Sequence, residues 1–221
     1  MPLKLIAFDL DGTLCNTIAD IAHALNRTLV RRGIASYTLP QVQAMVGHGM
    51  ANLCKSAMPK GREEEWRQVM EDYFADYSLH LCDSTRPYES IPEALHALKN
   101  HGYLLAVVSN KPHKNTVDMI HGIFPDWEKL FSAVQGQDPR FAVKPDPASL
   151  VYVLDSLGIK AEETLYVGDS EVDFAFASNT GTAFCGAAWG FRGRALLESL
   201  GYKQIMDLPI ELLKLCHKTQ S

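Results

Sequence analysis

The stretch Phe8-Asp9-Leu10-Asp11-Gly12-Thr13-Leu14 decides the fold of this chain. It continues the apolar run Leu5-Ile6-Ala7-Phe8, which predicts a buried strand. Two carboxylates two residues apart stand where that strand ends, and Gly12 predicts a turn directly after them. Burying two negative charges this close is costly unless a cation or a proton lies between them. The stretch therefore predicts a functional site at the end of a strand.

The rest of the chain divides into a helical part and an alternating part. Residues 15–86 show helical spacing near 18–29, 40–46, 50–58 and 62–81, and no strand pattern. Beyond them, apolar runs near 103–108, 131–134, 164–167 and 182–185 predict strands that alternate with helices. Such alternation is typical of a parallel sheet covered on both faces. We therefore expect a Rossmann-like α/β core, residues 1–14 and 87–221, with a small all-helical cap domain, residues 15–86, inserted after the first strand.

Composition excludes several classes of function. The chain has 221 residues, 47% of them hydrophobic, and a net charge of −5, so it shows no basic footprint for nucleic acid. Its five cysteines are scattered and odd in number, which is typical of a reducing compartment. It contains no apolar run long enough to span a bilayer and no signal-peptide pattern. We expect a cytoplasmic protein that binds neither nucleic acid nor membrane.

Polar side chains follow several of the predicted strands, where ligands of parallel sheets collect. Neighbouring carboxylates in one pocket require a hard cation, and Mg²⁺ prefers a site with few carboxylates and several waters. A lysine and a hydroxyl would add donors for phosphoryl oxygens. The set predicts phosphoryl transfer, and its members are Asp9, Asp11, Ser109, Asn110, Lys144, Asp169 and Asp173.

These residues fall in four ordered motifs that resemble those of the haloacid dehalogenase-like hydrolases. The motifs are Asp9-Leu10-Asp11-Gly12-Thr13-Leu14, Ser109-Asn110, Lys144-Pro145, and Gly168-Asp169-Ser170 with Asp173. Within the family the chain looks most like the phosphoglycolate phosphatase group. This closer similarity lies in Tyr88, Ile91-Pro92-Glu93-Ala94-Leu95 and Val46-Gly47-His48-Gly49.

The resemblance implies a nucleophile and an acid/base. Asp9 would attack phosphorus to form an aspartyl phosphate. Asp11 would protonate the leaving alkoxide and then deprotonate the attacking water. The carboxylates of Asp9 and Asp169 and the backbone carbonyl of Asp11 would bind Mg²⁺, with Asp173 holding Asp169 or a metal-bound water.

The resemblance also implies a phosphate-binding set. Ser109 and Lys144 would hold phosphoryl oxygens, and Lys144 would also restrain the Asp9 carboxylate. Thr13 and the backbone around Asn110 would orient and bind phosphate. His48, between two glycines, either reaches the leaving group of the substrate or faces solvent as a loop histidine.

The expected activity is hydrolysis of a small phosphorylated metabolite, with phosphoglycolate as the leading candidate, by a monomer or homodimer. The alternatives within the fold are a pyrophosphatase, a phosphonatase, a nucleotidase or a phosphosugar mutase. A phosphonatase needs a Schiff-base lysine from the cap, where Lys55 and Lys60 are present. A different class is a non-catalytic signalling module that is phosphorylated on aspartate.

The late segment Trp189-Gly190-Phe191-Arg192 either lines the cleft or serves packing of its two aromatics.

Overall fold

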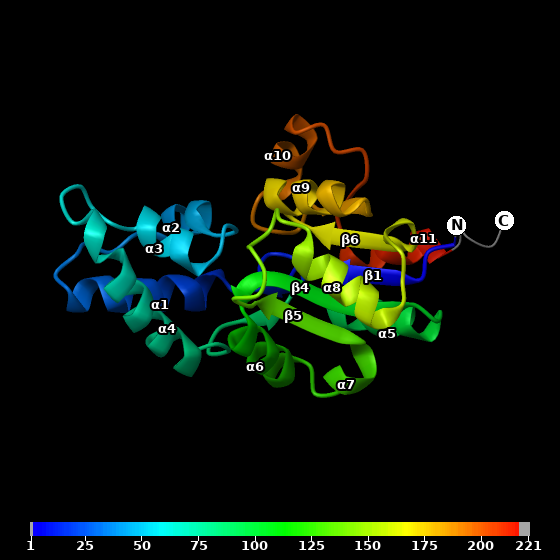
Figure 1. Cartoon of the computed structure of the whole chain (residues 1–221), viewed down its shortest axis with the longest axis horizontal. Coiled ribbons are helices and arrows are strands. Elements are labelled where there is room, and N and C mark those ends of the chain that lie inside the picture. Colours follow the sequence, from blue (N-terminus) through cyan, green and yellow to red (C-terminus); the bar gives the residue numbers. More distant parts are fainter. Residues whose placement is uncertain (1, 217–221) are drawn as a thin grey trace.

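A six-stranded parallel sheet forms the centre of the computed structural model, which describes residues 2–216 (Figure 1). The first strand of the chain lies in the interior of this sheet, between the fourth and the sixth strand. The parallel α/β core expected from the sequence is confirmed. In spatial order the strands are β5 (Ala133–Gln137), β4 (Leu104–Pro112), β1 (Leu5–Phe8), β6 (Thr164–Gly168), β7 (Ala183–Ala187) and β8 (Ile205–Met206).

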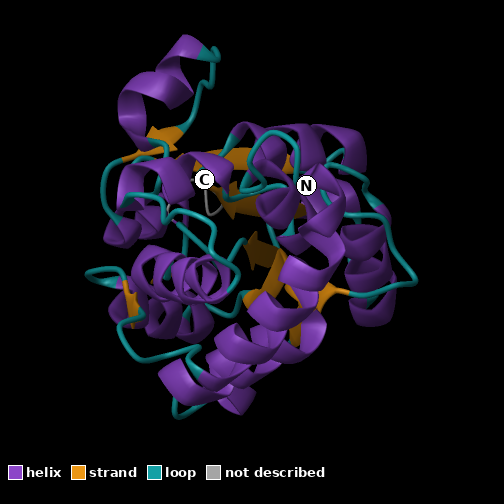
Figure 2. Cartoon of the chain, turned by 90° about the vertical axis from the view of Figure 1, so that its left-hand side faces the viewer, coloured by secondary structure: helices purple, strands orange, loops and turns teal. Residues whose placement is uncertain are grey.

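Strand β1 is apolar throughout because both of its faces are covered. Ile6 and Phe8 belong to the cluster that includes α5 (Ile91–Asn100). Leu5 and Ala7 face the opposite cluster, which includes α8 (Ala148–Leu157) and α9 (Glu171–Thr180). Seen from the side of the helical segment, helices surround the strands (Figure 2). The remaining elements of this part are α6 (His113–Ile123), α7 (Trp127–Leu130), η2 (Ala161–Glu163), α10 (Gly193–Ser199), η3 (Pro209–Leu212) and α11 (Leu213–Cys216).

Four helices between β1 and α5 form a group of their own, which we call the helical segment. It lies to one side of the sheet, at the left of Figure 1, with α1 against both α2 and α4. Its elements are α1 (Ile18–Arg31), α2 (Leu39–Met45), α3 (Met50–Ser56), η1 (Glu63–Glu65) and α4 (Trp66–Leu79).

The chain enters and leaves the helical segment through a small antiparallel ribbon, β2 (Cys15–Asn16) with β3 (Arg86–Pro87). The buried Asp20 ties the two passages together: its carboxylate accepts hydrogen bonds from the backbone N–H groups of Ser84 and Thr85 and from the Thr85 hydroxyl, at 2.7 to 2.9 Å. The sequence pattern predicts no strand in this region. Two-residue strands are too short to show alternation, so β2 and β3 were missed.

Element boundaries differ from the sequence-based expectation in three places. The strand expected at 131–134 is β5, Ala133–Gln137, and the helix expected at 62–81 is divided into η1 and α4. Strand β8 was not expected, since it contains only two residues. Cys15, Cys54, Cys82 and Cys185 are free thiols, whereas the side chain of Cys216 lies outside the described part. No helix within residues 2–216 combines the length and the apolar character that crossing a membrane requires.

Candidate active site

The register of the sheet brings the predicted motifs to one level. Phe8, the last residue of β1, pairs with Val107 of β4 and with Val167 of β6. The residues that come after each of these positions therefore lie side by side at the carboxyl ends of the strands. Asp9 comes after β1, Ser109 lies in β4, and Asp169 comes directly after β6. Strands β4, β1 and β6 are neighbours in the sheet, so their carboxyl ends lie at one edge.

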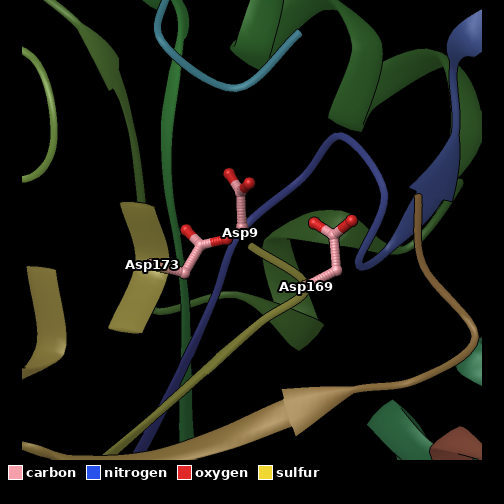
Figure 3. A group of neighbouring side chains, drawn as sticks. All are labelled: Asp9, Asp169 and Asp173. Carbon is pink, nitrogen blue, oxygen red and sulfur yellow. The ribbon is translucent and has the colours of Figure 1, made fainter. Parts of the chain in front are cut away.

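Three carboxylates gather at this edge (Figure 3). Asp9, Asp169 and Asp173 are all buried, and each offers an oxygen within 4.8 Å of the others. Asp9 comes from the loop after β1 and Asp169 from the turn between β6 and α9, whereas Asp173 lies in the first turn of α9. The Asp11 carboxylate is not a member of this cluster. Three buried acids at this spacing require compensation by positive charge or by protons.

Lys144 supplies part of that compensation. Its ammonium lies 2.9 Å from Asp9 Oδ1 and 2.7 Å from Asp173 Oδ1, and its side chain is only 2% exposed. It also donates a hydrogen bond to the hydroxyl of Tyr166 at 3.0 Å. The Tyr166 hydroxyl in turn donates to the carbonyl of Val108 at 2.8 Å. Lys144 is thus fixed by two acids and one tyrosine below the strand ends.

The electrostatics of the cluster reflect its burial. Burial raises the pKa of Asp9 to about 7, although the nearby Lys144 charge acts in the opposite direction. Burial and the neighbouring carboxylates of Asp173 and Asp9 raise the pKa of Asp169 well above its usual value. For Lys144 burial acts to lower the pKa, but Asp173 and Asp9 outweigh it and the pKa is raised. One lysine leaves the three acids with a net negative charge, an environment that suits a bound cation.

Asp173 is held by contacts to both of its oxygens. One oxygen contacts Lys144, and the other accepts hydrogen bonds from Ser170 Oγ at 2.7 Å and from the Ser170 backbone N–H at 3.2 Å. In contrast, the Asp9 carboxylate is engaged within residues 2–216 only by the 2.9 Å ion pair between its Oδ1 and Lys144. Asp9 is therefore the least engaged of the three acids.

Asp169 is held against two backbone segments. Its Oδ2 accepts a hydrogen bond from the N–H of Phe191 at 2.7 Å, and its Oδ1 lies 3.5 Å from the Thr13 hydroxyl, which donates to it. Gly12 and Gly190 approach so closely that an added Cβ would lie 2.6 Å and 2.3 Å from atoms of the Asp169 side chain. Only glycine fits at these two positions.

Asp11 has a cation of its own. The Lys111 ammonium lies 3.1 Å from Asp11 Oδ1, and it donates a hydrogen bond to the hydroxyl of Tyr77 at 2.7 Å. Tyr77 belongs to α4, so this contact connects the helical segment to the sheet edge. The ring of Tyr77 stacks on that of Tyr73, with centroids 5.4 Å apart.

A cavity of about 60 Å³ lies between the sheet edge and the helical segment. Asp9, Asp11, Ser109, Asn110 and Asp169 line it from the core, together with Lys111. The helical segment contributes mostly apolar wall, including Ile21, Val46, Met50, Leu53, Tyr73 and Tyr77. The cavity thus has a polar side, formed by the core, and a mostly apolar side, formed by the helical segment, which we call its roof.

The other sequence-predicted residues have distinct surroundings. The Asn110 side chain accepts a hydrogen bond from the Lys144 backbone N–H at 2.7 Å and donates to the Gly47 carbonyl at 3.0 Å. Ser109 is buried, and its hydroxyl oxygen accepts a hydrogen bond from the Lys111 N–H. His48 is exposed and does not line the cavity, although Gly47 and Gly49 beside it do. Its surroundings match the solvent-facing alternative.

The late segment around Phe191 takes part in the site, which the sequence left open. The Trp189 indole N–H donates to the Thr13 carbonyl at 2.9 Å, and Phe191 and Arg192 line the cavity. Arg192 donates to the carbonyls of Gln43 and Val46 in the helical segment, at 3.0 and 2.9 Å.

Sequence reasoning missed the parts played by Lys111, Tyr77 and Tyr166. Tyr166 lies inside an apolar strand, where nothing marks its hydroxyl as a partner of Lys144. Lys111 directly follows a predicted motif, and this position was the available signal for it.

Residues 6–187 match the model described as haloacid dehalogenase-like hydrolase. A phosphoglycolate phosphatase of Haemophilus influenzae is 35% identical over 201 residues, covering 85% of this chain and 87% of that protein. A phosphoglycolate phosphatase of Aquifex aeolicus is 33% identical over 192 residues, covering 86% of each protein.

Solved structures share the whole fold. A crystal structure of a "predicted phosphoglycolate phosphatase" from Haemophilus somnus is 30% identical, with a TM-score of 0.86 and coverage of 96% of this chain and 97% of that one. A crystal structure from Lactobacillus delbrueckii subsp. bulgaricus reaches a TM-score of 0.90 at 26% identity, with coverage of 98% and 99%. The similarity includes the helical segment as well as the sheet.

Proposed function

Because this chain belongs to the haloacid dehalogenase-like hydrolases, we propose that it is a phosphatase that hydrolyses a small phosphate monoester, with 2-phosphoglycolate as the leading substrate. One observation carries the proposal: the buried Asp9 carboxylate lines the cavity, and its Oδ1 lies 2.9 Å from the Lys144 ammonium. The names of the relatives at 33% and 35% identity support the choice of substrate.

In the proposed reaction Asp9 attacks phosphorus, and the bond between phosphorus and the ester oxygen breaks. Asp11 gives its proton to the departing oxygen, so the product leaves as an alcohol. Asp11 then takes a proton from water, which attacks the aspartyl phosphate and releases phosphate and the free Asp9 carboxylate. The cavity supports this role, because Asp11 and Asp9 both line it.

The residues present fit a divalent cation. We propose that the carboxylates of Asp9 and Asp169 and the backbone carbonyl of Asp11 hold Mg²⁺, since hard oxygen ligands suit this ion. The ion would supply positive charge that lets an anionic nucleophile approach an anionic phosphate. Asp173 would stay outside the ligand set, because Lys144 and Ser170 already engage its oxygens.

Phosphate binding is assigned to the strand ends. We propose that the Ser109 hydroxyl, Lys144 and the backbone around Asn110 hold the phosphoryl oxygens. The Asn110 side chain fixes the Lys144 loop through its 2.7 Å hydrogen bond, and Thr13 orients Asp169. His48, being exposed, would contact a ligand only after a movement of its loop.

We further propose that residues 15–86 act as a cap domain on a core of residues 1–14 and 87–221. The β2–β3 ribbon brings both ends of this segment together, and its side chains form the roof of the cavity. Closure of such a roof excludes water and sets which leaving groups fit. Cytoplasmic location and a monomeric or homodimeric state stay predictions.

Asp9→Asn tests the nucleophile. With Mg²⁺ and 2-phosphoglycolate we expect a loss of turnover of at least about 10³-fold, because an amide cannot form the aspartyl phosphate. Asp155→Asn on the exposed side of α8 is the matched control and should keep wild-type turnover. Near wild-type turnover by Asp9→Asn would refute the assignment. Removal of divalent ions with a chelator should abolish activity, and added Mg²⁺ should restore it.

A substrate panel separates the alternatives. Pyrophosphate, a nucleoside monophosphate, a hexose phosphate and a phosphonate should all be poorer substrates than 2-phosphoglycolate. A phosphonatase has no support from the cavity, because Lys55 and Lys60 are exposed and neither lines it. A signalling module would instead show slow aspartyl-phosphate turnover and no ester hydrolysis.

A further inference from the structure

Lys111 is a buried cation to which the proposed chemistry gives no task. Its side chain is 3% exposed, and it lines the cavity beside Asp11. A buried ammonium is costly unless it is paired and hydrogen-bonded, so its presence calls for an explanation. It lies at the end of β4, whereas its hydrogen-bond partner Tyr77 belongs to the helical segment.

The two buried lysines of the site differ in how fully they are engaged. Lys144 contacts Asp9, Asp173 and the Tyr166 hydroxyl. An ammonium has three N–H donors, and within residues 2–216 the hydrogen bond from Lys111 Nζ goes to Tyr77, beside a 3.1 Å ion pair with Asp11. At least one donor of Lys111 is therefore without a partner in the described part of the chain.

Tyr77 adds a second donor at the same place. Its hydroxyl oxygen accepts the hydrogen bond from Lys111, and its own O–H has no acceptor within the described part of the chain. Burial raises the pKa of Tyr77 well above 10, so the hydroxyl keeps its proton. A core ammonium and a hydroxyl of the helical segment thus stand 2.7 Å apart in one wall, each with a hydrogen to give.

This donor pair lies where the leaving group must be. In the proposed function Asp11 hands its proton to the ester oxygen, and Lys111 Nζ is 3.1 Å from the Asp11 carboxylate. In a bound substrate, a substituent one or two bonds beyond the ester oxygen would therefore lie near Lys111 and Tyr77. The nearby roof, with Ile21, Leu53 and Tyr73, offers no other charged partner.

Arg192 is the other cation of the cavity wall, and it is otherwise engaged. Its guanidinium donates to the carbonyls of Gln43 and Val46 and lies 3.4 Å from Glu171. These contacts hold the helical segment to the core. Lys111 is therefore the cation of the cavity wall that can bind a charged group on the leaving group of the substrate.

Building on the proposed function, we propose that Lys111 and Tyr77 form a subsite for a carboxylate on the leaving group. The subsite selects short phosphorylated hydroxy acids, in which the carboxylate is one or two carbons from the ester oxygen, over uncharged phosphate esters. One donor comes from the core and one from the helical segment, so the carboxylate binds to both at once. The cavity of about 60 Å³ restricts the leaving group to a small one.

Lys111→Met tests the subsite by removing the charge while keeping the length of the side chain. The measured quantity is the ratio of kcat/KM for 2-phosphoglycolate to that for ethyl phosphate, which lacks the carboxylate. We expect this ratio to fall by about 10- to 100-fold, the usual range for one hydrogen bond to a charged group. Tyr77→Phe, which removes one oxygen, should lower the ratio by about 3- to 10-fold.

The matched control is Lys114→Met, since Lys114 is 74% exposed on neighbouring α6 and should leave the ratio at its wild-type value. Equal losses on both substrates in Lys111→Met and Tyr77→Phe would overturn the proposal and reduce Lys111 to a partner of Asp11. Tyr77→Phe carries the test alone if Lys111→Met does not fold.

Binding without turnover gives an independent measurement. Calorimetric titration with Mg²⁺ should show tighter binding of 3-phosphonopropionate than of propylphosphonate to the wild type, and Lys111→Met should lose this preference. A wild type that hydrolyses ethyl phosphate and 2-phosphoglycolate equally well would overturn the subsite and leave the phosphatase standing. A wild type that hydrolyses no ester would instead overturn the proposed function.

Discussion

Replacing Gly12 by alanine tests how tightly the first loop holds Asp169. The φ angle of Gly12 is +85°, in the left-handed region that favours glycine. A Cβ added there would lie 2.6 Å from Asp169 Oδ2 and 2.8 Å from its Cγ, so the carboxylate must move. Asp169 then loses its 2.7 Å hydrogen bond from the Phe191 N–H.

The expected loss of stability has two parts. The left-handed backbone costs an alanine about 1 to 2 kcal/mol. The lost hydrogen bond to a charged, buried group costs about 2 kcal/mol more. Gly12→Ala should therefore lower the free energy of unfolding by about 3 to 4 kcal/mol, which corresponds to a fall in Tm of roughly 10 °C for a chain of this size.

Gly33→Ala is the matched control, because Gly33 has a φ of +67° and nothing lies within 4 Å of its added Cβ. It should show the backbone cost alone, a fall in Tm of roughly 4 °C. Urea and thermal unfolding measure the difference between the variants. Added Mg²⁺ should raise the Tm of the wild type and of Gly33→Ala but not of Gly12→Ala. Equal destabilisation of both variants, with the same response to Mg²⁺, would refute the reasoning.

Three further variants probe other contacts. Tyr166→Phe removes one of the partners of Lys144 and one donor to the Val108 carbonyl, so the free energy of unfolding should fall by about 1 to 2 kcal/mol and kcat for the phosphate ester should also fall. Arg192→Ala frees the helical segment, so KM for the phosphate ester should rise about tenfold. Burial acts to raise the pKa of Asp76, but its arginine partners outweigh it and lower the pKa. Asp76→Asn should therefore lose about 1 to 2 kcal/mol of stability at neutral pH, and this loss should shrink as acid protonates the wild-type carboxyl.

Each of these variants has a control on the surface. Tyr152→Phe, at a tyrosine 43% exposed, should change stability by less than about 0.5 kcal/mol. Arg67→Ala removes an exposed arginine of α4 and should leave KM unchanged. Asp72→Asn breaks an exposed ion pair and should show little pH-dependent loss. Effects as large as those of the buried partners would contradict the assigned contacts, and so would an Asp76→Asn loss that does not shrink in acid.

The acids and Lys144 were predictable because strand ends and charge are both visible in a sequence. Apolar runs locate β1, β4 and β6, and parallel pairing then brings the residues just after these strands to one edge of the sheet. Asp9, Lys144 and Asp169 meet there as expected. Their roles in the reaction stay predictions that the proposed variants test.

The remaining contacts depend on packing, which one sequence does not display. The Phe191 N–H that binds Asp169 is a backbone group, and every residue except proline has one. Tyr77 reaches Lys111 only because α4 folds back over the sheet edge. Strands β2 and β8 contain two residues each, so alternation has no length over which to appear.

The β2–β3 ribbon has a consequence for how this architecture diversifies. Cys15 pairs with Pro87 and Asn16 with Arg86, so the chain leaves the core and returns to it, about seventy residues later, at the same two-stranded ribbon. Insertions, deletions or exchanges in the segment between β2 and β3 would therefore leave the register of the core strands unchanged. Recombination at this ribbon would exchange Tyr77 and the apolar roof of the cavity, whereas Lys111 and the buried acids would stay with the core strands.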